Sequence, residues 1–194
     1  MAELGHTVVG ADIDAAKVKS LTSGISPIAE SGMNEGIAHN VSAGRLSFTT
    51  DVVGSIQTAD VVFLCLPTPQ GDDGSADLSY IEAVARQIGP HLAPGTVVVN
   101  KSTVPVGSSV QVGQWLGRTD VFVVSNPEFL RQGTALQDFL HPTRIVVGGD
   151  NEAAVEKVAS LYAAVDAPIL RMNAASAEAL KAICASKHCC WPSL

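Results

Sequence analysis

The residues best suited to chemistry lie between Val124 and Gly149, in the stretch VSNPEFLRQGTALQDFLHPTRIVVGG. Apolar residues at both ends of this stretch are typical of strands. The polar and charged members between them are Asn126, Glu128, Arg131, Gln132, His141 and Arg144. Carboxylates can transfer protons, and cations can stabilise negative charge that develops during a reaction. A simple connection between two strands needs none of these groups, so the sequence predicts a binding or catalytic segment here.

Polar residues also follow other apolar runs of the chain. Asp12 follows HTVVGA, Thr68 follows DVVFLCLP, and Ser102 with Thr103 follows GTVVVNK. One such residue alone is more simply a turn or helix-capping residue, and Asp14 is the better N-cap of the helix after Asp12. Because the carboxyl ends of parallel strands meet at one edge of a sheet, all of them together predict a ligand cleft.

Short apolar runs alternate with amphipathic stretches along the chain, and these elements would position the polar residues. Strands are predicted at 6–12, 45–50, 60–67, 95–102, 120–126, 144–149 and 167–172. Helices are predicted at 14–24, 31–44, 51–59, 77–92, 107–117, 133–140, 151–165 and from 176 onward. This alternation predicts an α/β fold with a doubly wound, mostly parallel sheet of the Rossmann-like kind.

Two positions in the strands have simple structural interpretations. The run DVVFLCLP is apolar almost throughout, which predicts a strand covered on both faces and makes Cys65 a small core residue. Lys101, at the end of another strand, is interpreted as a solvated charge.

Composition excludes several classes of protein. The 194 residues carry a formal net charge of −7, which argues against a nucleic-acid-binding surface. No apolar run is long enough to span a membrane, and no signal peptide is recognisable. The chain has 4 cysteines, and their spacing is not that of a metal site. These features predict a reduced, cytoplasmic protein without a metal.

The amino-terminal segment carries part of a dinucleotide-binding pattern. In such folds an acidic residue ends the second strand, about 20 residues after a glycine-rich turn. Asp12 fits the acidic position, which would put the glycine-rich turn before residue 1. We therefore expect this chain to lack the first strand and the glycine-rich phosphate-binding loop.

Five segments in register resemble the UDP-glucose/GDP-mannose dehydrogenase family. They are ELGHTVVGADID, LPTPQGDDGSADLSYI, VVVNKSTVPVGS, SNPEFLRQGTALQDFLHPTRIVVGG and SAEALK. The resemblance implies NAD as cofactor and UDP-glucose or a related sugar nucleotide as substrate. It also implies oxidation of the sugar C6 alcohol to a carboxylate in two hydride transfers, through a thioester on a cysteine. Full-length members of the family are homo-oligomers.

The resemblance implies roles for residues along the expected cofactor cleft. Asp12 is similar to the family's ribose-binding acid, and Lys17 to a basic residue near the adenosine. Thr68 and Pro69 lie in LPTPQ, which resembles the loop along the cofactor. The remaining cofactor contacts by resemblance are Ser102, Thr103 and Gln132, of which Gln132 replaces the acid usual in the family.

The resemblance also implies a catalytic group and a substrate loop. Glu128 resembles the glutamate that handles protons or activates water, and a dry cleft would raise its pKa. Thr103 resembles a threonine that helps to position water, and Lys181 a lysine that stabilises negative charge on the sugar oxygen. The segment Phe129, Leu130 and Arg131 resembles the part that runs past the sugar nucleotide, as Lys181 also does.

The resemblance ends near Lys181, which gives a division of the chain. We expect a truncated NAD-binding domain at 1–172, the start of a central helix at 173–183, and a tail at 184–194 unlike the family. Cys184, Cys189 and Cys190 are outside the sequence context of the family's nucleophile, so the chain alone is expected to be inactive. Two alternatives stay open: a related GDP-mannose or UDP-N-acetylhexosamine dehydrogenase, or a non-catalytic nucleotide-binding remnant.

Overall fold

The structure is a computed structural model that describes residues 1–71, 75–131 and 133–185. Its strands are β1 (Val8–Ala11), β2 (Leu46–Thr49), β3 (Val61–Leu64), β4 (Val97–Asn100), β5 (Phe122–Ser125), β6 (Ile145–Gly148) and β7 (Ile169–Met172). Its α-helices are α1 (Ala15–Thr22), α2 (Met33–Ser42), α3 (Val52–Ile56), α4 (Ser79–Ile88), α5 (Ser108–Leu116), α6 (Ala135–Leu140), α7 (Glu152–Ser160) and α8 (Ala174–Ala185). Short 3₁₀ turns, η1 (Ala2–Leu4) and η2 (Gly89–His91), complete the described elements.

Local sequence signals explain where several helices begin. The Asp14 carboxylate accepts a hydrogen bond from the Ala16 N–H at 2.8 Å and caps α1. Asp51 accepts from the Gly54 N–H at 2.8 Å and caps α3, and Asn151 caps α7 in the same way. Each cap satisfies a backbone donor that the first helical turn leaves without a partner.

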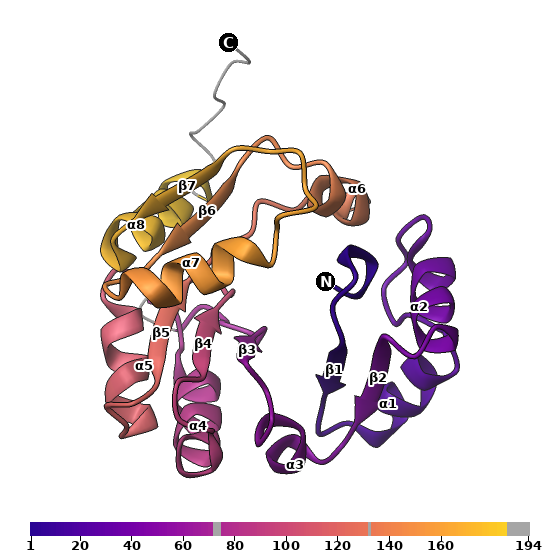
Figure 1. Cartoon of the computed structure of the whole chain (residues 1–194), viewed down its shortest axis with the longest axis horizontal. Coiled ribbons are helices and arrows are strands. Elements are labelled where there is room, and N and C mark those ends of the chain that lie inside the picture. Colours follow the sequence, from indigo (N-terminus) through magenta and orange to yellow (C-terminus); the bar gives the residue numbers. More distant parts are fainter. Residues whose placement is uncertain (72–74, 132, 186–194) are drawn as a thin grey trace.

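The strands form two sheets, with β1 beside β2 in one and the order β3-β4-β5-β6-β7 in the other. All neighbouring strands are parallel except β5 and β6, which run antiparallel and share one paired position, Ser125 with Gly148. The mostly parallel α/β fold predicted from the alternation is therefore confirmed. Figure 1 shows β1 and β2 with α1 and α2 on one side of the molecule, and the larger sheet on the other.

Helices cover both faces of the larger sheet. On one face Ile81 and Ile88 of α4 and Val112 of α5 pack with Val98. On the other face α7 packs its apolar side, including Val158, against β4 and β6. α8 lies beside α5 and over β6, which explains the near-continuous apolar character of the central strands.

The strand β3 departs from the prediction. Val61, Val62 and Phe63 are half-buried and only Leu64 is buried, so the run is not fully covered. Cys65 follows the strand and is exposed, and its interpretation as a core residue is wrong. Within the described residues β3 pairs with β4 on one side only, so it lacks the second neighbour that would cover it. The absence of a first strand and of a glycine-rich loop stays a prediction.

Candidate active site

Two loops at the carboxyl end of the larger sheet are joined by side-chain hydrogen bonds. The hydroxyl of Ser102 donates to the backbone oxygen of Leu66 at 2.7 Å and accepts from the Leu66 N–H at 3.1 Å. The hydroxyl of Thr68 donates to the backbone oxygen of Thr103 at 3.0 Å. The structure thus brings together the segments that follow β3 and β4, as the positions of these residues predict. Pro69 is exposed in the same loop.

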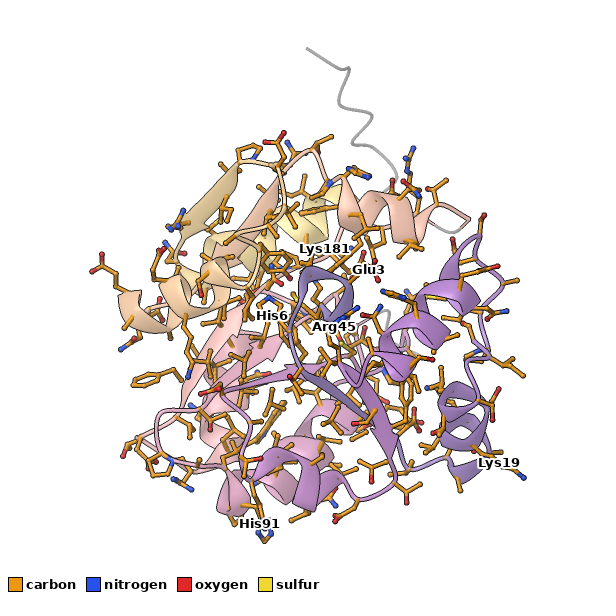
Figure 2. The ribbon with its side chains drawn as sticks, turned by 45° about the vertical axis from the view of Figure 1, so that its right-hand side comes forward. Glu3, His6, Lys19, Arg45, His91 and Lys181 are labelled. Carbon is orange, nitrogen blue, oxygen red and sulfur yellow. The ribbon has the colours of Figure 1, made fainter. Side chains whose placement is uncertain are left out.

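Glu128 and Lys181 form an ion pair although 53 positions separate them in sequence. Lys181 Nζ lies 2.9 Å from Glu128 Oε1, and it also donates to the backbone oxygen of Glu128. Glu128 follows β5 and Lys181 lies in α8. In Figure 2 Lys181 lies near the middle of the view, whereas Lys19 and His91 lie at its edge.

The predicted raised pKa of Glu128 is wrong. Burial acts to raise the pKa of this carboxyl, but the Leu130 N–H, Lys181 and Lys101 act against it, and the net pKa is lowered. The Leu130 N–H donates to Glu128 Oε2 at 2.6 Å. Donors and cations that favour the charged form outweigh partial desolvation here. Glu128 is therefore ionised at neutral pH.

The residues after Glu128 differ in their environment. Two cations lie close to the Phe129 ring, with Lys181 Nζ 5.5 Å and Arg144 Cζ 5.9 Å from its centroid. Leu130 is exposed. Arg131 is paired with Asp138 through contacts of 2.7 and 3.1 Å, and this guanidinium holds the pKa of the Asp138 carboxyl well below its usual range. The Arg131 side chain stays 76% exposed in this bidentate pair.

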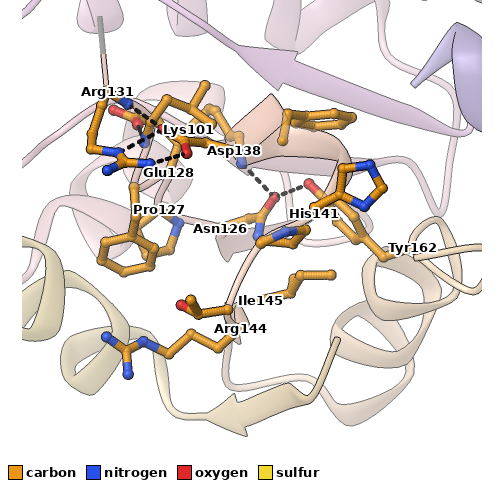
Figure 3. Close-up of a pocket in the computed structure, with 15 residues that line it drawn as sticks. Lys101, Asn126, Pro127, Glu128, Arg131, Asp138, His141, Arg144, Ile145 and Tyr162 are labelled. Atoms are coloured by element: carbon orange, nitrogen blue, oxygen red, sulfur yellow. Dashed lines mark hydrogen bonds and ion pairs between the residues drawn. The ribbon is translucent and has the colours of Figure 1, made fainter. Parts of the chain in front are cut away.

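A pocket of about 730 Å³ opens between the segment after β5, the segment before β6 and the turn after α7 (Figure 3). Residues contributed by these three places include Asn126, Glu128, His141, Arg144 and Tyr162. The stretch from Val124 to Gly149, which the sequence predicts to be a binding or catalytic segment, thus supplies most of the residues that line this pocket. A pocket of this size is in the range that binds small molecules.

Lys101 also lines this pocket, and its interpretation as a solvated charge is wrong. Lys101 Nζ donates to Asn126 Oδ1 at 3.1 Å and lies 6.0 Å from the centroid of the Tyr162 ring. Burial lowers the pKa of Lys101 to about 8. The side chain directly follows β4 and is only partly buried, and its ammonium lies against Asn126 and Tyr162 instead of standing free in solvent.

Asp12 and Lys17 form a second charged pair at the carboxyl end of β1. The ammonium of Lys17 and then the Asp14 N–H lower the pKa of the Asp12 carboxyl. This pair belongs to the smaller sheet, apart from the Glu128–Lys181 pair in the larger one.

Some predicted positions have no described structure, and one buried residue was not foreseen. Gln132, Cys189 and Cys190 lie outside the described residues, as does the side chain of Cys184. Glu178, three residues before Lys181, is 1% exposed and was not singled out from the sequence. A carboxylate on the inward side of an amphipathic helix is the signal that could have found it.

The described residues contain no group of three or more His, Cys, Asp and Glu side chains arranged to hold a metal ion. Within the same residues, no helix is both long and apolar enough to cross a bilayer.

Comparison with known proteins gives a family that agrees with this geometry. Residues 1–166 match the model of the UDP-glucose/GDP-mannose dehydrogenase family, NAD binding domain. The chain belongs to this family. It is 40% identical over 185 residues to a UDP-glucose 6-dehydrogenase of Bacillus subtilis, covering 93% of this chain and 40% of that protein. It is also 40% identical over 196 residues to a GDP-mannose 6-dehydrogenase of Azotobacter vinelandii, covering 95% and 45%.

Solved structures show the same fold. A GDP-mannose dehydrogenase of Pseudomonas aeruginosa superposes with a TM-score of 0.86 at 33% identity, covering 94% of this chain and 44% of that one. A UDP-glucose dehydrogenase of Pyrobaculum islandicum superposes with a TM-score of 0.85 at 41% identity, covering 93% and 44%. The chain thus spans less than half the length of these family members.

Proposed function

We propose that this chain is the NAD-binding part of a UDP-glucose 6-dehydrogenase, and that it carries one side of the site where the sugar is oxidised. The observation that carries the proposal is the Glu128–Lys181 pair, which stands beside a pocket on the segment after β5. An ionised carboxylate can accept a proton from an alcohol or a water, and the neighbouring ammonium can stabilise the negative charge that forms on the oxygen.

The chain's residues fit NAD in two places. Asp12, half-buried at the carboxyl end of β1, is placed to accept hydrogen bonds from ribose hydroxyls, with Lys17 beside it. The second place is the pair of hydrogen-bonded segments after β3 and β4, which contain Thr68, Pro69 and Ser102 and which we assign to contacts with the cofactor. NAD, when bound, accepts the hydride removed from the sugar. We also assign Gln132 to contacts with the cofactor because of its place in the sequence.

The pair and the loop that follows it are assigned to the sugar nucleotide. Glu128 accepts the proton, and Lys181 stabilises the negative charge that develops on the sugar oxygen. Thr103 helps to position a water. Phe129, Leu130 and Arg131 line the path of the nucleotide, with the exposed side chain of Arg131 available to an anionic group.

The proposal also covers the substrate, an alternative role and the cellular location of the protein. The partner we propose is UDP-glucose, and the alternatives are GDP-mannose or a UDP-N-acetylhexosamine, since both sugar-nucleotide classes occur among the relatives. A non-catalytic nucleotide-binding role is the alternative from another class of protein. We place the protein in the cytoplasm, where sugar nucleotides are available as substrates.

Binding tests the proposal more directly than turnover, because the chain spans about 40% of the Bacillus relative. Calorimetry of the 194-residue chain with NAD, and separately with UDP-glucose and GDP-mannose, should show saturable binding of NAD and of one sugar nucleotide. Glu128→Gln and Lys181→Met should weaken binding of the sugar nucleotide and have a smaller effect on binding of NAD. Lys19→Met, at an exposed position of α1, is the matched control. Absence of both kinds of binding in the folded chain would refute the proposal.

A further inference from the structure

Glu178 is a buried carboxylate that joins two helices. It lies in α8, is 1% exposed, and both of its carboxylate oxygens accept hydrogen bonds. Its Oε2 accepts from the Gly107 N–H at 2.6 Å. Its Oε1 accepts from the Ser109 N–H at 2.8 Å and from the Ser109 hydroxyl at 2.6 Å.

The donors around Glu178 replace a cationic partner. Within the described residues, no lysine, arginine or histidine forms an ion pair with Glu178. Gly107 is the N-cap of α5 and has no side chain to cap the helix. Glu178 therefore caps α5 from another helix, and the positive end of the α5 dipole favours its charge. A buried carboxylate without these donors would be strongly destabilising.

The contact lies between the two halves of the candidate site. On one side, α5 follows directly on the segment of Ser102 and Thr103, which is bonded to Leu66 and Thr68. On the other side, Lys181 lies three residues after Glu178 in α8, about one helical turn further on. Glu178 is thus one contact that joins the helix after the Ser102–Thr103 segment to the helix that carries Lys181.

We propose that Glu178 is a positioning residue. By capping α5 it fixes how α8 is rotated about its axis and how far it is shifted along that axis, and it thereby holds the Lys181 ammonium against the Glu128 carboxylate. The geometric part of this inference concerns only this chain. Its consequence for oxidation of the sugar rests on the proposed function.

The test compares Glu178→Gln with the unchanged chain of 194 residues, using NMR titration of the Glu128 carboxyl at a temperature where both are folded. Glutamine keeps the size of the side chain but removes the charge, and its NH₂ group meets donors instead of acceptors. Lys181 should then leave Glu128, and the pKa of Glu128 should rise by about 0.5 or more. An unchanged pKa of Glu128 would overturn the inference.

Two further variants separate positioning from a loss of stability. Ile81→Val in α4 lowers stability in the core away from α8, and it should leave the pKa of Glu128 unchanged. Ser109→Ala removes one donor and leaves the Glu178 charge in place, so it should give a smaller rise in the pKa of Glu128. If Glu178→Gln does not fold, Ser109→Ala is the deciding variant. A rise in the pKa of Glu128 supports the inference, and an unchanged pKa of Glu128 overturns it.

The readout does not depend on a ligand. If NAD and the sugar nucleotide fail to bind while Glu178→Gln still raises the pKa of Glu128, the proposed function fails and the positioning role stands. If the ligands bind and the pKa of Glu128 stays constant in Glu178→Gln, the positioning role fails alone.

Discussion

The phenol of Tyr162 donates a hydrogen bond to the side-chain oxygen of Asn126 at 2.5 Å, and both residues are buried. The same oxygen accepts from Lys101 at 3.1 Å, while the Asn126 amide nitrogen donates to the Val146 backbone oxygen at 2.7 Å. The orientation of the amide is therefore fixed on both sides. The turn after α7, β6 and the residue after β4 thus meet at the side chain of Asn126.

Replacing Tyr162 by phenylalanine should destabilise the fold. The change removes a donor to a buried oxygen and leaves the rest of the ring in place, which costs about 1–2 kcal/mol in the free energy of unfolding. Urea denaturation followed by circular dichroism measures it. Tyr80→Phe is the matched control, because Tyr80 is 53% exposed, and it should change stability by less than about 0.5 kcal/mol. Equal effects of the two changes on the free energy of unfolding would show that the hydrogen bond from Tyr162 to Asn126 does not stabilise the fold.

Lys101 should make stability rise with pH in the alkaline range. Its folded-state pKa of about 8 lies below the unfolded value, so between the two values the unfolded state binds more protons. Compared with Lys101→Met, the unchanged chain should gain about 3 kcal/mol in the free energy of unfolding across this range. Denaturation at several pH values, with Lys19→Met as control, measures the difference. A constant difference between the chain and Lys101→Met would contradict the burial of the ammonium.

The Glu128–Lys181 pair should also stabilise the fold more as pH rises, but in the acid range. The pKa of Glu128 is lowered in the folded state, so its contribution is present above the unfolded value and is lost as pH falls through the folded value. A double-mutant cycle of Glu128→Gln and Lys181→Met should give a coupling of about 0.5–1 kcal/mol at pH 7.

The Glu82–Arg86 pair on α4 serves as the control cycle for this prediction. It is an exposed i,i+4 pair and should couple by about 0.3–0.5 kcal/mol. A Glu128–Lys181 coupling that persists unchanged in strong acid would refute an ionic contact.

Gly148 should tolerate no side chain because α8 passes too close. A Cβ atom there would lie 2.4 Å from the Ala177 Cβ and 2.8 Å from the Asn173 backbone oxygen. Gly148→Ala should therefore destabilise the fold by about 1–3 kcal/mol. Gly36→Ala in α2 meets no atom within 4 Å, so it should stabilise by about 0.5–1 kcal/mol. Thermal unfolding of both variants measures the contrast, and a shared sign would contradict the packing of α8.

Periodicity and capping residues predicted most of the fold. Asp14 and Asp51 begin α1 and α3 as their positions indicate, because an N-cap is a local interaction among neighbouring residues. The apolar residues of α4 lie on its buried side for the same reason, since their spacing alone defines a face.

Properties that depend on distant neighbours could not be predicted in this way. The pKa of Glu128 depends on Lys181, and the partial burial of Lys101 depends on its contacts with Asn126 and Tyr162. Glu178 caps a helix that begins 70 positions earlier in the sequence, counting back to Ser108. Cys65 is exposed because β3 has a neighbour on one side only within the described residues. Each of these requires the tertiary contacts, which no local pattern contains.

The hydrogen bonds between the segments after β3 and β4 have a consequence for how the site responds to a ligand. Ser102 acts on Leu66 as both donor and acceptor, and Thr68 closes the other end on Thr103. Neither loop can shift without breaking bonds to the other, so their fluctuations are correlated. A molecule that contacts only one of the loops will therefore slow amide hydrogen exchange in both loops, so the two loops respond to a ligand as one cooperative unit.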